Sequence, residues 1–489
     1  MIIRTDIPLE VQNVADTLED AGFEAYLVGG CIRDILIGKE PKDWDITTNA
    51  KPAEIEALFE ETYNNNDFGT VGVVTDSESP STKVVEVTPY RAESGYSDAR
   101  RPDSVEFGVS LKEDLARRDF TVNAIAYRLK TEETVDLFEG IKDIKDKRLR
   151  AVGEAGLRFN EDALRMMRAV RLASELDFTI DADTFAAIEK TSEKLGKISK
   201  ERVCDEFSKI IASDRPMQGV VFLEKTRLLP HVLPELLEGI GIDQNQAHAF
   251  DVYEHLLRTL QHAADERFSF EIRLAGLLHD IGKPASRRWS DEKKDWTFYG
   301  HEVIGTRMTR KILKDLRFSR ETSEVVEKLV RWHMFFSDPD LITLSAVRRT
   351  IRNVGEDRIF DLLNLRICDR IGSGRPKAQP FRFRKYKSMV EEALRDPISV
   401  KMLAIDGGRI MEVAGEKPGP KLGYVLHALL EEVLDDPKKN TADYLEKRTQ
   451  ELLKLPEKEL AALGEEGKDR REDEEAAAVK ELRRKNKVV

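Results

Sequence analysis

The sequence predicts an α+β protein, in which a domain with a mixed sheet and helices comes first and an all-α region follows. Short valine-rich runs bounded by polar turns alternate with helical patterns up to about residue 153. From residue 154 onward the pattern is helical throughout, with no convincing strand. At 489 residues the chain is also too long for one ordinary domain.

Composition narrows the class of protein. Hydrophobic residues make up 40% of the chain and charged residues 35%, which is typical of a soluble globular protein. No apolar run approaches the ~18 residues that a membrane span requires, and the start of the chain lacks a signal peptide pattern. The cysteines (Cys31, Cys204 and Cys368) are too scattered for a disulfide framework or a zinc ribbon, so we expect a cytoplasmic protein. The net charge of −12 argues against a general nucleic-acid coat but leaves room for a local basic face.

The most informative stretch is YLVGGCIRDILIGKEPKDWDIT, near the start of the chain. It predicts a strand, a glycine turn, a helix and a second strand. Alternate residues of a strand share a face, so Asp43 and Asp45 can hold one or two divalent ions between them. Gly29 and Gly30 allow the backbone to approach a ligand, and Arg33 adds a positive charge in the first turn of the helix. A triphosphate cradle beside paired carboxylates indicates nucleotidyl transfer.

This order of elements resembles the signature of the DNA polymerase β-like nucleotidyltransferases. Together with later segments, the chain is similar to the class II tRNA nucleotidyltransferases, which are the CCA-adding enzymes and their poly(A) polymerase relatives. The resemblance implies a polymerase β-like nucleotidyltransferase head, then an all-α neck, HD domain and body. It also implies that Asp43 and Asp45 hold two Mg²⁺ ions.

The remainder of the head contains two further strands and a second motif. The runs NNNDFGTVGVVT and KVVEVTPYR read as strands, and Glu86 on the second is either a third catalytic carboxylate or an ordinary exposed glutamate. Residues 91–102 read as a mobile loop.

RRDFTVNA, residues 117–124, can be interpreted in two ways. Arg117 and Arg118 pair with Asp114 and Asp119 as a surface ion cluster, or else Arg118 binds the triphosphate while Asp119 and Asn123 lie near the ribose. The segment resembles the second motif of the family almost letter for letter, and this favours nucleotide binding.

Residues 158–178 are predicted to form one helix that selects the base. Asp162, Arg165, Arg168 and Arg171 recur at steps of three, and a solvated salt-bridged helix is the alternative. A carboxylate only accepts hydrogen bonds and an arginine only donates them, so Asp162 and Arg165 together match cytosine and adenine but not uracil or guanine. Arg168 and Arg171 would support this pair or contact phosphate. The resemblance assigns base selection to the E-D-x-x-R pattern, here Glu161, Asp162 and Arg165.

The middle of the chain resembles the HD-type metal phosphohydrolases. The segments DVYEHLLRTL, AGLLHDIGKP, FYGHEVIG, RWHMFF and LRICDRIG carry the resemblance. It implies a first metal site from His255, His279, Asp280 and Asp369, and a second completed by His301 and His333, with Lys283 near a phosphate. Imidazole and carboxylate ligands suit a divalent transition metal such as Mn, Ni, Co or Fe. We expect phosphodiesterase or phosphatase activity on RNA ends.

The segment GSGRPKAQPFRFRKYKSM is the best candidate for RNA contact, although a basic linker is an equally simple reading. We expect its aromatic residues Phe381, Phe383 and Tyr386 to stack on bases. They are interleaved with the predicted RNA-binding residues Arg375, Lys377, Arg382, Arg384, Lys385 and Lys387. The GGR and GEKPGPKLG turns further on resemble the family's C-terminal body and are a second candidate contact with the tRNA backbone.

The predicted domains are the head at 1–153, the neck at 154–245, the HD domain at 246–375, a tRNA-binding body at 376–464 and a charged tail at 465–489. The predicted reaction is template-independent addition of C, C and A to tRNA 3′ ends from CTP and ATP. The alternatives are an A-adding enzyme or poly(A) polymerase, an HD phosphohydrolase with an RNA-docking head, and a noncatalytic tRNA-binding scaffold. The sequence leaves the oligomeric state open.

Overall fold

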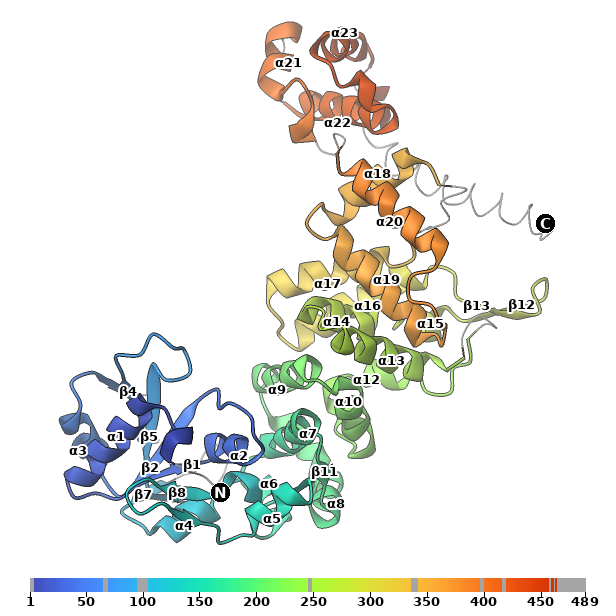
Figure 1. The fold of residues 1–489 in the computed structure, drawn as a ribbon. Helices are drawn as coiled ribbons and strands as arrows, with labels where there is room; N and C mark the ends of the chain where they lie inside the picture. Colours follow the sequence, from blue (N-terminus) through green and yellow to red (C-terminus); the bar gives the residue numbers. More distant parts are fainter. Residues whose placement is uncertain are drawn as a thin grey trace. The chain divides into compact units, whose positions relative to one another are not determined.

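The fold is taken from a computed structural model, in which the chain forms two compact units (Figure 1). They are Met1–Glu238 with Ile312–Phe318, and Gly239–Lys311 with Ser319–Val489. The structure describes residues 4–64, 69–94, 104–244, 249–335, 342–395, 400–415, 419–456, 459–460 and 462–463. The predicted charged tail lies outside these residues, as do residues 95–102 of the predicted loop and residues 416–418 of the GEKPGPKLG turn.

A seven-stranded mixed sheet organises the head. Its order is β3-β4-β5-β2-β1-β8-β9, and β2 and β5 are its one parallel pair. The strands are β1 (Ala25–Val28), β2 (Trp44–Thr48), β3 (Thr62–Asn64), β4 (Val71–Val74), β5 (Val84–Pro89), β8 (Ala126–Arg128) and β9 (Glu133–Val135). Leu27, Ile46 and Val87 are fully buried on this sheet, so the valine-rich runs form the core as predicted. This mixed sheet confirms the predicted fold class of the head.

Short helices surround the sheet. They are α1 (Leu9–Asp20), α2 (Gly30–Leu36), α3 (Pro52–Leu58), α4 (Leu111–Ala116) and α5 (Gly140–Lys145), with a 3₁₀ turn at Thr121–Asn123. In a separate two-stranded sheet, β6 (Arg91–Ser94) pairs with β7 (Ser104–Phe107). The prediction of a loop from residue 91 was therefore wrong for its first four residues, because they pair with β7, which begins at Ser104.

The rest of the first unit is helical. It contains α6 (Ala155–Glu161), α7 (Leu164–Leu176), α8 (Ala182–Thr191), α9 (Lys200–Ala212), α10 (Pro216–Lys225), α11 (Leu229–Val232) and α12 (Pro234–Leu237). The prediction of one helix over 158–178 was wrong, because Asp162 adopts an extended conformation between α6 and α7. Its carboxylate accepts a hydrogen bond from the Leu164 backbone N–H, which starts the second helix. A short parallel pair, β10 (Arg148–Leu149) and β11 (Thr179–Ile180), also departs from the expected absence of strands.

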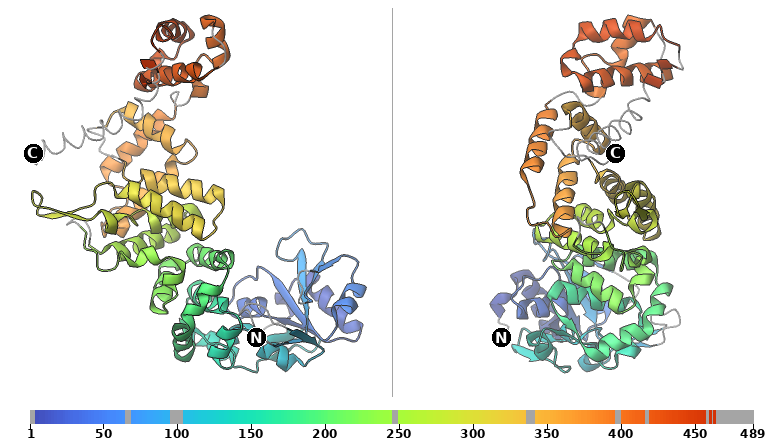
Figure 2. Two further views of the ribbon diagram at one scale, coloured as in Figure 1. Left: turned by 180° about the vertical axis from the view of Figure 1, so that it is seen from behind. Right: turned by 90° about the vertical axis from the view of Figure 1, so that its right-hand side faces the viewer.

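Helices dominate from residue 252 onward (Figure 2). They are α13 (Val252–Asp265), α14 (Phe270–Leu278), α15 (Lys283–Ser286), α16 (His301–Asp315), α17 (Arg320–Trp332), α18 (Leu344–Val354), α19 (Ile359–Gly372), α20 (Phe381–Ala393), α21 (Gly407–Ala414), α22 (Pro420–Asp435) and α23 (Ala442–Leu452). Helix α13 packs against both α14 and α19, and α14 packs against α17. These contacts bring the distant HD segments together.

A β-hairpin interrupts these helices and was not predicted. Strands β12 (Arg288–Ser290) and β13 (Asp295–Thr297) pair in antiparallel fashion with Trp289 opposite Trp296. The tryptophans and threonine favour strands, and Lys294 adopts a positive φ of 49° in the polar turn. Figures 1 and 2 both show the hairpin projecting from the helices of the second unit.

Candidate functional sites in the head and the HD domain

Three carboxylates meet on one face of the head sheet. Asp45 on β2 lies directly opposite Glu86 on the parallel strand β5, and Asp43 comes two residues before Asp45. Side chains in register on neighbouring strands share a face. Asp43 was predicted on the same strand as Asp45, but it lies in a bend just before β2, and its charge still acts on Asp45. Burial and the negative charges of Asp43 and Glu86 raise the pKa of Asp45 to about 7, while Arg118 acts in the opposite direction. Clustered carboxylates that repel one another fit a hard divalent cation, which supplies the missing positive charge.

The glycine turn keeps the backbone close to these carboxylates. Gly29 has a φ of +86°, which favours glycine, and the predicted helix α2 begins directly after it at Gly30. A Cβ at Gly29 would lie 3.3 Å from Asp45 Oδ2 and 3.5 Å from Arg118 Nη1. Arg33 donates from Nη1 to Asn123 Oδ1 at 2.8 Å, which ties the first motif to the second. The two motifs therefore form one site.

The second motif forms part of the predicted ion cluster. Asp114 is fully buried and accepts hydrogen bonds from Arg117 (2.6 Å), Arg118 (3.3 Å) and the Thr47 hydroxyl (3.1 Å). The ion cluster therefore exists, and Thr47 connects it to the strand that carries Asp45. Asp119 does not join the cluster through these arginines, because its carboxylate pairs with Arg168. Arg118 Nε is buried and has no hydrogen-bond partner among the described residues.

The residues predicted to select the base do not all lie on one helical face, because Asp162 lies between α6 and α7. Asp162 Oδ2 accepts from Arg202 Nη2 at 2.7 Å, and Arg165 Nη1 donates to Glu161 Oε2 at 2.6 Å. Arg165 also reaches the Arg117 carbonyl at 3.3 Å, so it lies beside the second motif. Asp162 and Arg165 are thus oriented by separate partners.

The remaining arginines of α7 have buried carboxylate partners. Arg168 binds Asp119 through Nε (2.8 Å) and Nη2 (2.6 Å). Despite the opposing effect of burial, Arg168 lowers the pKa of Asp119 to about 2. Arg171 pairs with Glu206 on α9 at 2.7 Å. Sequence reasoning missed Arg202 and Glu206, because both partners come from a helix more than thirty residues away.

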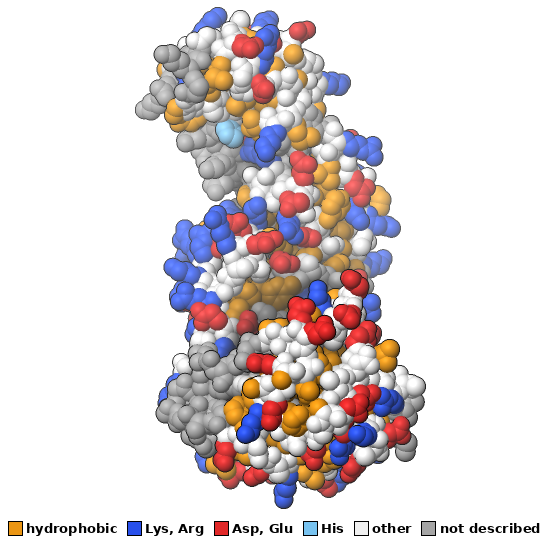
Figure 3. Space-filling view, turned by 90° about the vertical axis from the view of Figure 1, so that its left-hand side faces the viewer, with side chains coloured by type: hydrophobic (Ala, Val, Ile, Leu, Met, Phe, Trp, Pro, Cys, Tyr) orange, Lys and Arg blue, Asp and Glu red, His pale blue; other side chains and the backbone are white. Residues whose placement is uncertain are grey.

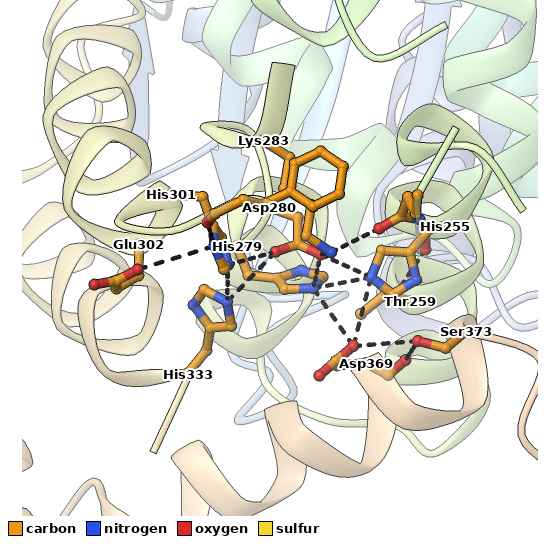
Figure 4. A network of polar contacts seen from close by, with 12 residues as sticks. His255, Thr259, His279, Asp280, Lys283, His301, Glu302, His333, Asp369 and Ser373 are labelled. Carbon is orange, nitrogen blue, oxygen red and sulfur yellow. Dashed lines mark hydrogen bonds and ion pairs between the residues drawn. The ribbon is translucent and has the colours of Figure 1, made fainter. Parts of the chain in front are cut away.

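The HD residues converge in the second unit (Figure 4). Two groups could each hold a metal ion: His255 with His279 and Asp369, and Asp280 with His301 and His333. Asp280 belongs to the second group and also contacts the histidines of the first. Its Oδ2 is 3.1 Å from His255 Nε2 and 3.2 Å from His279 Nε2. Its Oδ1 is 3.1 Å from His301 Nε2 and 3.4 Å from His333 Nε2.

Backbone carbonyls orient the imidazoles of this cluster. The Nδ1 atoms of His279, His301 and His333 lie 2.9, 2.6 and 2.7 Å from the carbonyl oxygens of Gly276, Phe298 and Val330. With Nδ1 held by a carbonyl, each ring turns Nε2 toward Asp280. This arrangement is typical of metal-ligating histidines, so the residues fit two divalent ions.

Two further side chains border the cluster. Lys283 is buried, and its Nζ lies 2.5 Å from Asp280 Oδ2 and 2.6 Å from Gln244 Oε1. Arg366 binds the other side of the cluster, at 2.6 Å from Asp369 Oδ2. Lys283 was predicted to lie near a phosphate, whereas Gln244 and Arg366 were not anticipated from the sequence.

The predicted RNA-binding segment forms the start of α20. Arg382, Arg384 and Lys385 are exposed, as is Lys377 before the helix, whereas Arg375 and Lys387 are partly buried. The expected stacking role of its aromatics was wrong for Phe383 and Tyr386, because both are buried in the core. Phe381 is 68% exposed. Figure 3 shows Lys and Arg side chains gathered on one face of the second unit.

Three family profiles match the chain in succession. Residues 25–150 match "Poly A polymerase head domain", residues 177–239 match "Probable RNA and SrmB- binding site of polymerase A", and residues 252–371 match "HD domain". The first and third matches contain the carboxylate site of the head and the histidine cluster.

Relatives and solved structures agree with these matches. A CCA-adding enzyme of Lactobacillus helveticus is 34% identical over 91% of this chain and 98% of its own length. One of Pediococcus pentosaceus is 50% identical over 45% of this chain and 54% of its own length. The crystal structure of a Bacillus stearothermophilus CCA-adding enzyme in complex with CTP is similar with a TM-score of 0.64 and 27% identity, covering 92% of this chain and all of that one. The chain therefore belongs to the CCA-adding enzyme family.

Proposed function

We propose that this protein adds C, C and A to tRNA 3′ ends from CTP and ATP, with release of pyrophosphate. The observation that carries the proposal is the meeting of Asp43, Asp45 and Glu86 beside Gly29 and Arg118. Full-length similarity to CCA-adding enzymes supports the choice of substrate. An A-adding enzyme and a poly(A) polymerase are the competing functions.

Each residue of the head has a role in this proposal. Asp43, Asp45 and Glu86 would hold two Mg²⁺ ions, which when bound lower the pKa of the attacking 3′-hydroxyl and stabilise charge at the α-phosphate. Arg118 would bind the triphosphate, because its Nε is buried without a partner and unpaired buried donors are costly. Asp114 helps to position Arg118, because it accepts a hydrogen bond from Arg118 Nη2.

The other nucleotide-binding residues lie around this phosphate site. Gly29 and Gly30 would admit the triphosphate close to the backbone. Arg33 holds Asn123, which with Asp119 would bind the ribose. Arg168 and Arg171 would fix the helix that carries Arg165 through their pairs with Asp119 and Glu206.

Base selection would depend on Asp162 and Arg165. Replacing Asp162 by Ala is expected to lower kcat/KM for CTP and ATP about 5- to 150-fold, since one matched hydrogen-bonding pair contributes about 1–3 kcal/mol of discrimination. The kcat/KM for UTP should change little, so the preference of the enzyme for CTP and ATP over UTP falls. Single-nucleotide incorporation with each of the four triphosphates measures this. Asp183→Ala is the control, and equal losses for all four triphosphates would contradict a role in selection.

The proposed reaction is tested with Mg²⁺ and labelled tRNA transcripts that end at the discriminator base, after the first C, or after the second C. Each transcript receives single triphosphates and then CTP with ATP. Addition of C, C and A followed by a stop is the expected result. Extension of only the last transcript would identify an A-adding enzyme, and long A tails a poly(A) polymerase.

We further propose that the HD domain is a phosphodiesterase or phosphatase that uses Mn, Ni, Co or Fe. The observation that favours it is Asp280, which contacts both ligand groups with different oxygens. Lys283 would bind the phosphate of the substrate. Cyclic phosphates and 3′-phosphates block extension of an RNA end, so such an activity would prepare substrates for the head.

The tRNA would contact the basic residues around α20, and the protein would work in the cytoplasm. No described helix is both long enough and apolar enough to span a bilayer.

Arg409 of the GGR turn forms ion pairs with Glu412 on α21 and Glu446 on α23. Its side chain therefore links these two helices of the body.

A further inference from the structure

The hairpin of β12 and β13 carries large aromatic side chains on its surface. We call residues 287–299 the ribbon. Trp289 is 50% exposed and Tyr299 is 61% exposed, although large aromatics are mostly buried elsewhere in the described chain. Trp296 packs edge-to-face on Trp289 with ring centroids 5.3 Å apart.

Cations lie against these rings. The Arg287 guanidinium is 3.8 Å from the centroid of Trp296. Lys293 Nζ donates to the Tyr299 hydroxyl at 2.7 Å and lies 5.1 Å from the centre of its ring. Arg288 and Lys294 are exposed on the same ribbon. Aromatic faces with adjacent cations suit stacked bases and their phosphates.

Both ends of the ribbon are attached to the HD cluster. It follows Lys283 by four residues and ends two residues before His301. The Phe298 carbonyl oxygen lies 2.6 Å from His301 Nδ1, and Lys283 Nζ lies 5.6 Å from the centre of the Phe298 ring. The base of the ribbon is therefore in contact with residues that would bind metal and phosphate.

Hairpin stability alone accounts for only part of this arrangement. A cross-strand tryptophan pair stabilises a two-stranded ribbon, which is otherwise marginal in water. That role explains the contact between Trp289 and Trp296. Hairpin stability does not require Tyr299, which lies beyond the paired residues. It also does not require the cations that lie on the rings of Trp296 and Tyr299. The acidic residues Asp291 and Glu292 lie at the turn, away from the base of the ribbon.

We propose that the ribbon binds the single-stranded 3′ end of an RNA by stacking bases on Trp289 and Tyr299, and leads its terminal phosphate toward the HD cluster. Only the delivery of the terminal phosphate rests on the proposed hydrolase function of the HD cluster. Binding of RNA to the ribbon is a property of the ribbon itself.

The binding step is tested with the full-length chain and a short single-stranded RNA that carries 4-thiouridine near its 3′ end. Photo-crosslinking followed by peptide mapping is expected to place the RNA on residues 287–300. Trp289→Ala and Tyr299→Ala should each weaken binding about 5- to 150-fold, because stacking on one aromatic contributes about 1–3 kcal/mol per base. Trp289→Phe should retain most of the affinity, and Glu292→Ala at the turn is the matched control.

The hydrolytic step is measured on two substrates. With an RNA ending in a 2′,3′-cyclic phosphate, Trp289→Ala should raise KM about tenfold, whereas hydrolysis of bis(p-nitrophenyl) phosphate should be unchanged. An absence of crosslinks on the ribbon, or unchanged RNA affinity in Trp289→Ala and Tyr299→Ala, would overturn the proposal. If neither substrate is hydrolysed but the crosslinks map to the ribbon, the hydrolase function fails and the RNA-binding ribbon stands.

Discussion

Replacing Asp45 by Asn is expected to reduce CMP and AMP addition at least about a thousand-fold, equivalent to about 4 kcal/mol of activation free energy. The substitution keeps the shape of the side chain but removes the charge that Asp45 shares with Asp43 and Glu86. An amide is a weak ligand for Mg²⁺, so the positions of the ions and of the α-phosphate are both lost. Incorporation of labelled CMP into a tRNA transcript measures the effect.

Stability measurements separate this effect from misfolding. Since Asp43 and Glu86 repel the Asp45 carboxylate, Asn at this position should leave the metal-free protein at least as stable to heat as the original. Asp76→Asn, an exposed aspartate on the same domain, should leave addition unchanged. If Asp45→Asn retained activity within tenfold of the original, the assignment of the metal site would be wrong.

Replacing Asp280 by Asn is expected to abolish metal binding in the HD domain. The two oxygens of Asp280 face different ligand groups, so one substitution removes a charged ligand from both. After loading with Mn²⁺ and desalting, metal analysis should show about two fewer ions per chain than in the original protein. Hydrolysis of bis(p-nitrophenyl) phosphate should fall about a thousand-fold, while CCA addition should be unaffected.

A second variant addresses the risk of unfolding. Removing the Asp280 charge leaves Lys283 buried beside a neutral amide, and breaking a buried ion pair costs about 3–5 kcal/mol. His301→Gln affects only one group and should lower the metal content by about one ion. Asp357→Asn on an exposed turn is the control. Full metal content in Asp280→Asn would contradict the shared role of this carboxylate.

Local patterns predicted the elements of the head well. The glycine turn and the D-x-D strand follow from backbone freedom and from the period of two, both of which are properties of neighbouring residues. The placement of Glu86 opposite Asp45 depends on the register of β2 and β5, which are neighbours in the sheet but are not consecutive in the sequence. The sequence could therefore name Glu86 as a candidate but not establish its position.

The errors have identifiable physical causes. Apolar periodicity continues through residues 158–178, and it concealed the helix break at Asp162, although an aspartate before an apolar run is itself a helix-start signal. Phe383 and Tyr386 were read as RNA contacts because the linear segment is basic, whereas helical spacing turns both rings into the core. The hairpin at 287–299 was missed because its strands have only three residues each.

The two candidate sites lie in different compact units. The residues proposed for nucleotide addition all lie in the first compact unit, and the histidine cluster lies entirely in the second. Among the described residues, the groups proposed for each site come from a single unit. In evolution, substitutions could therefore erase the histidine cluster of a descendant while its polymerase chemistry persisted, and selection could act on the two activities independently.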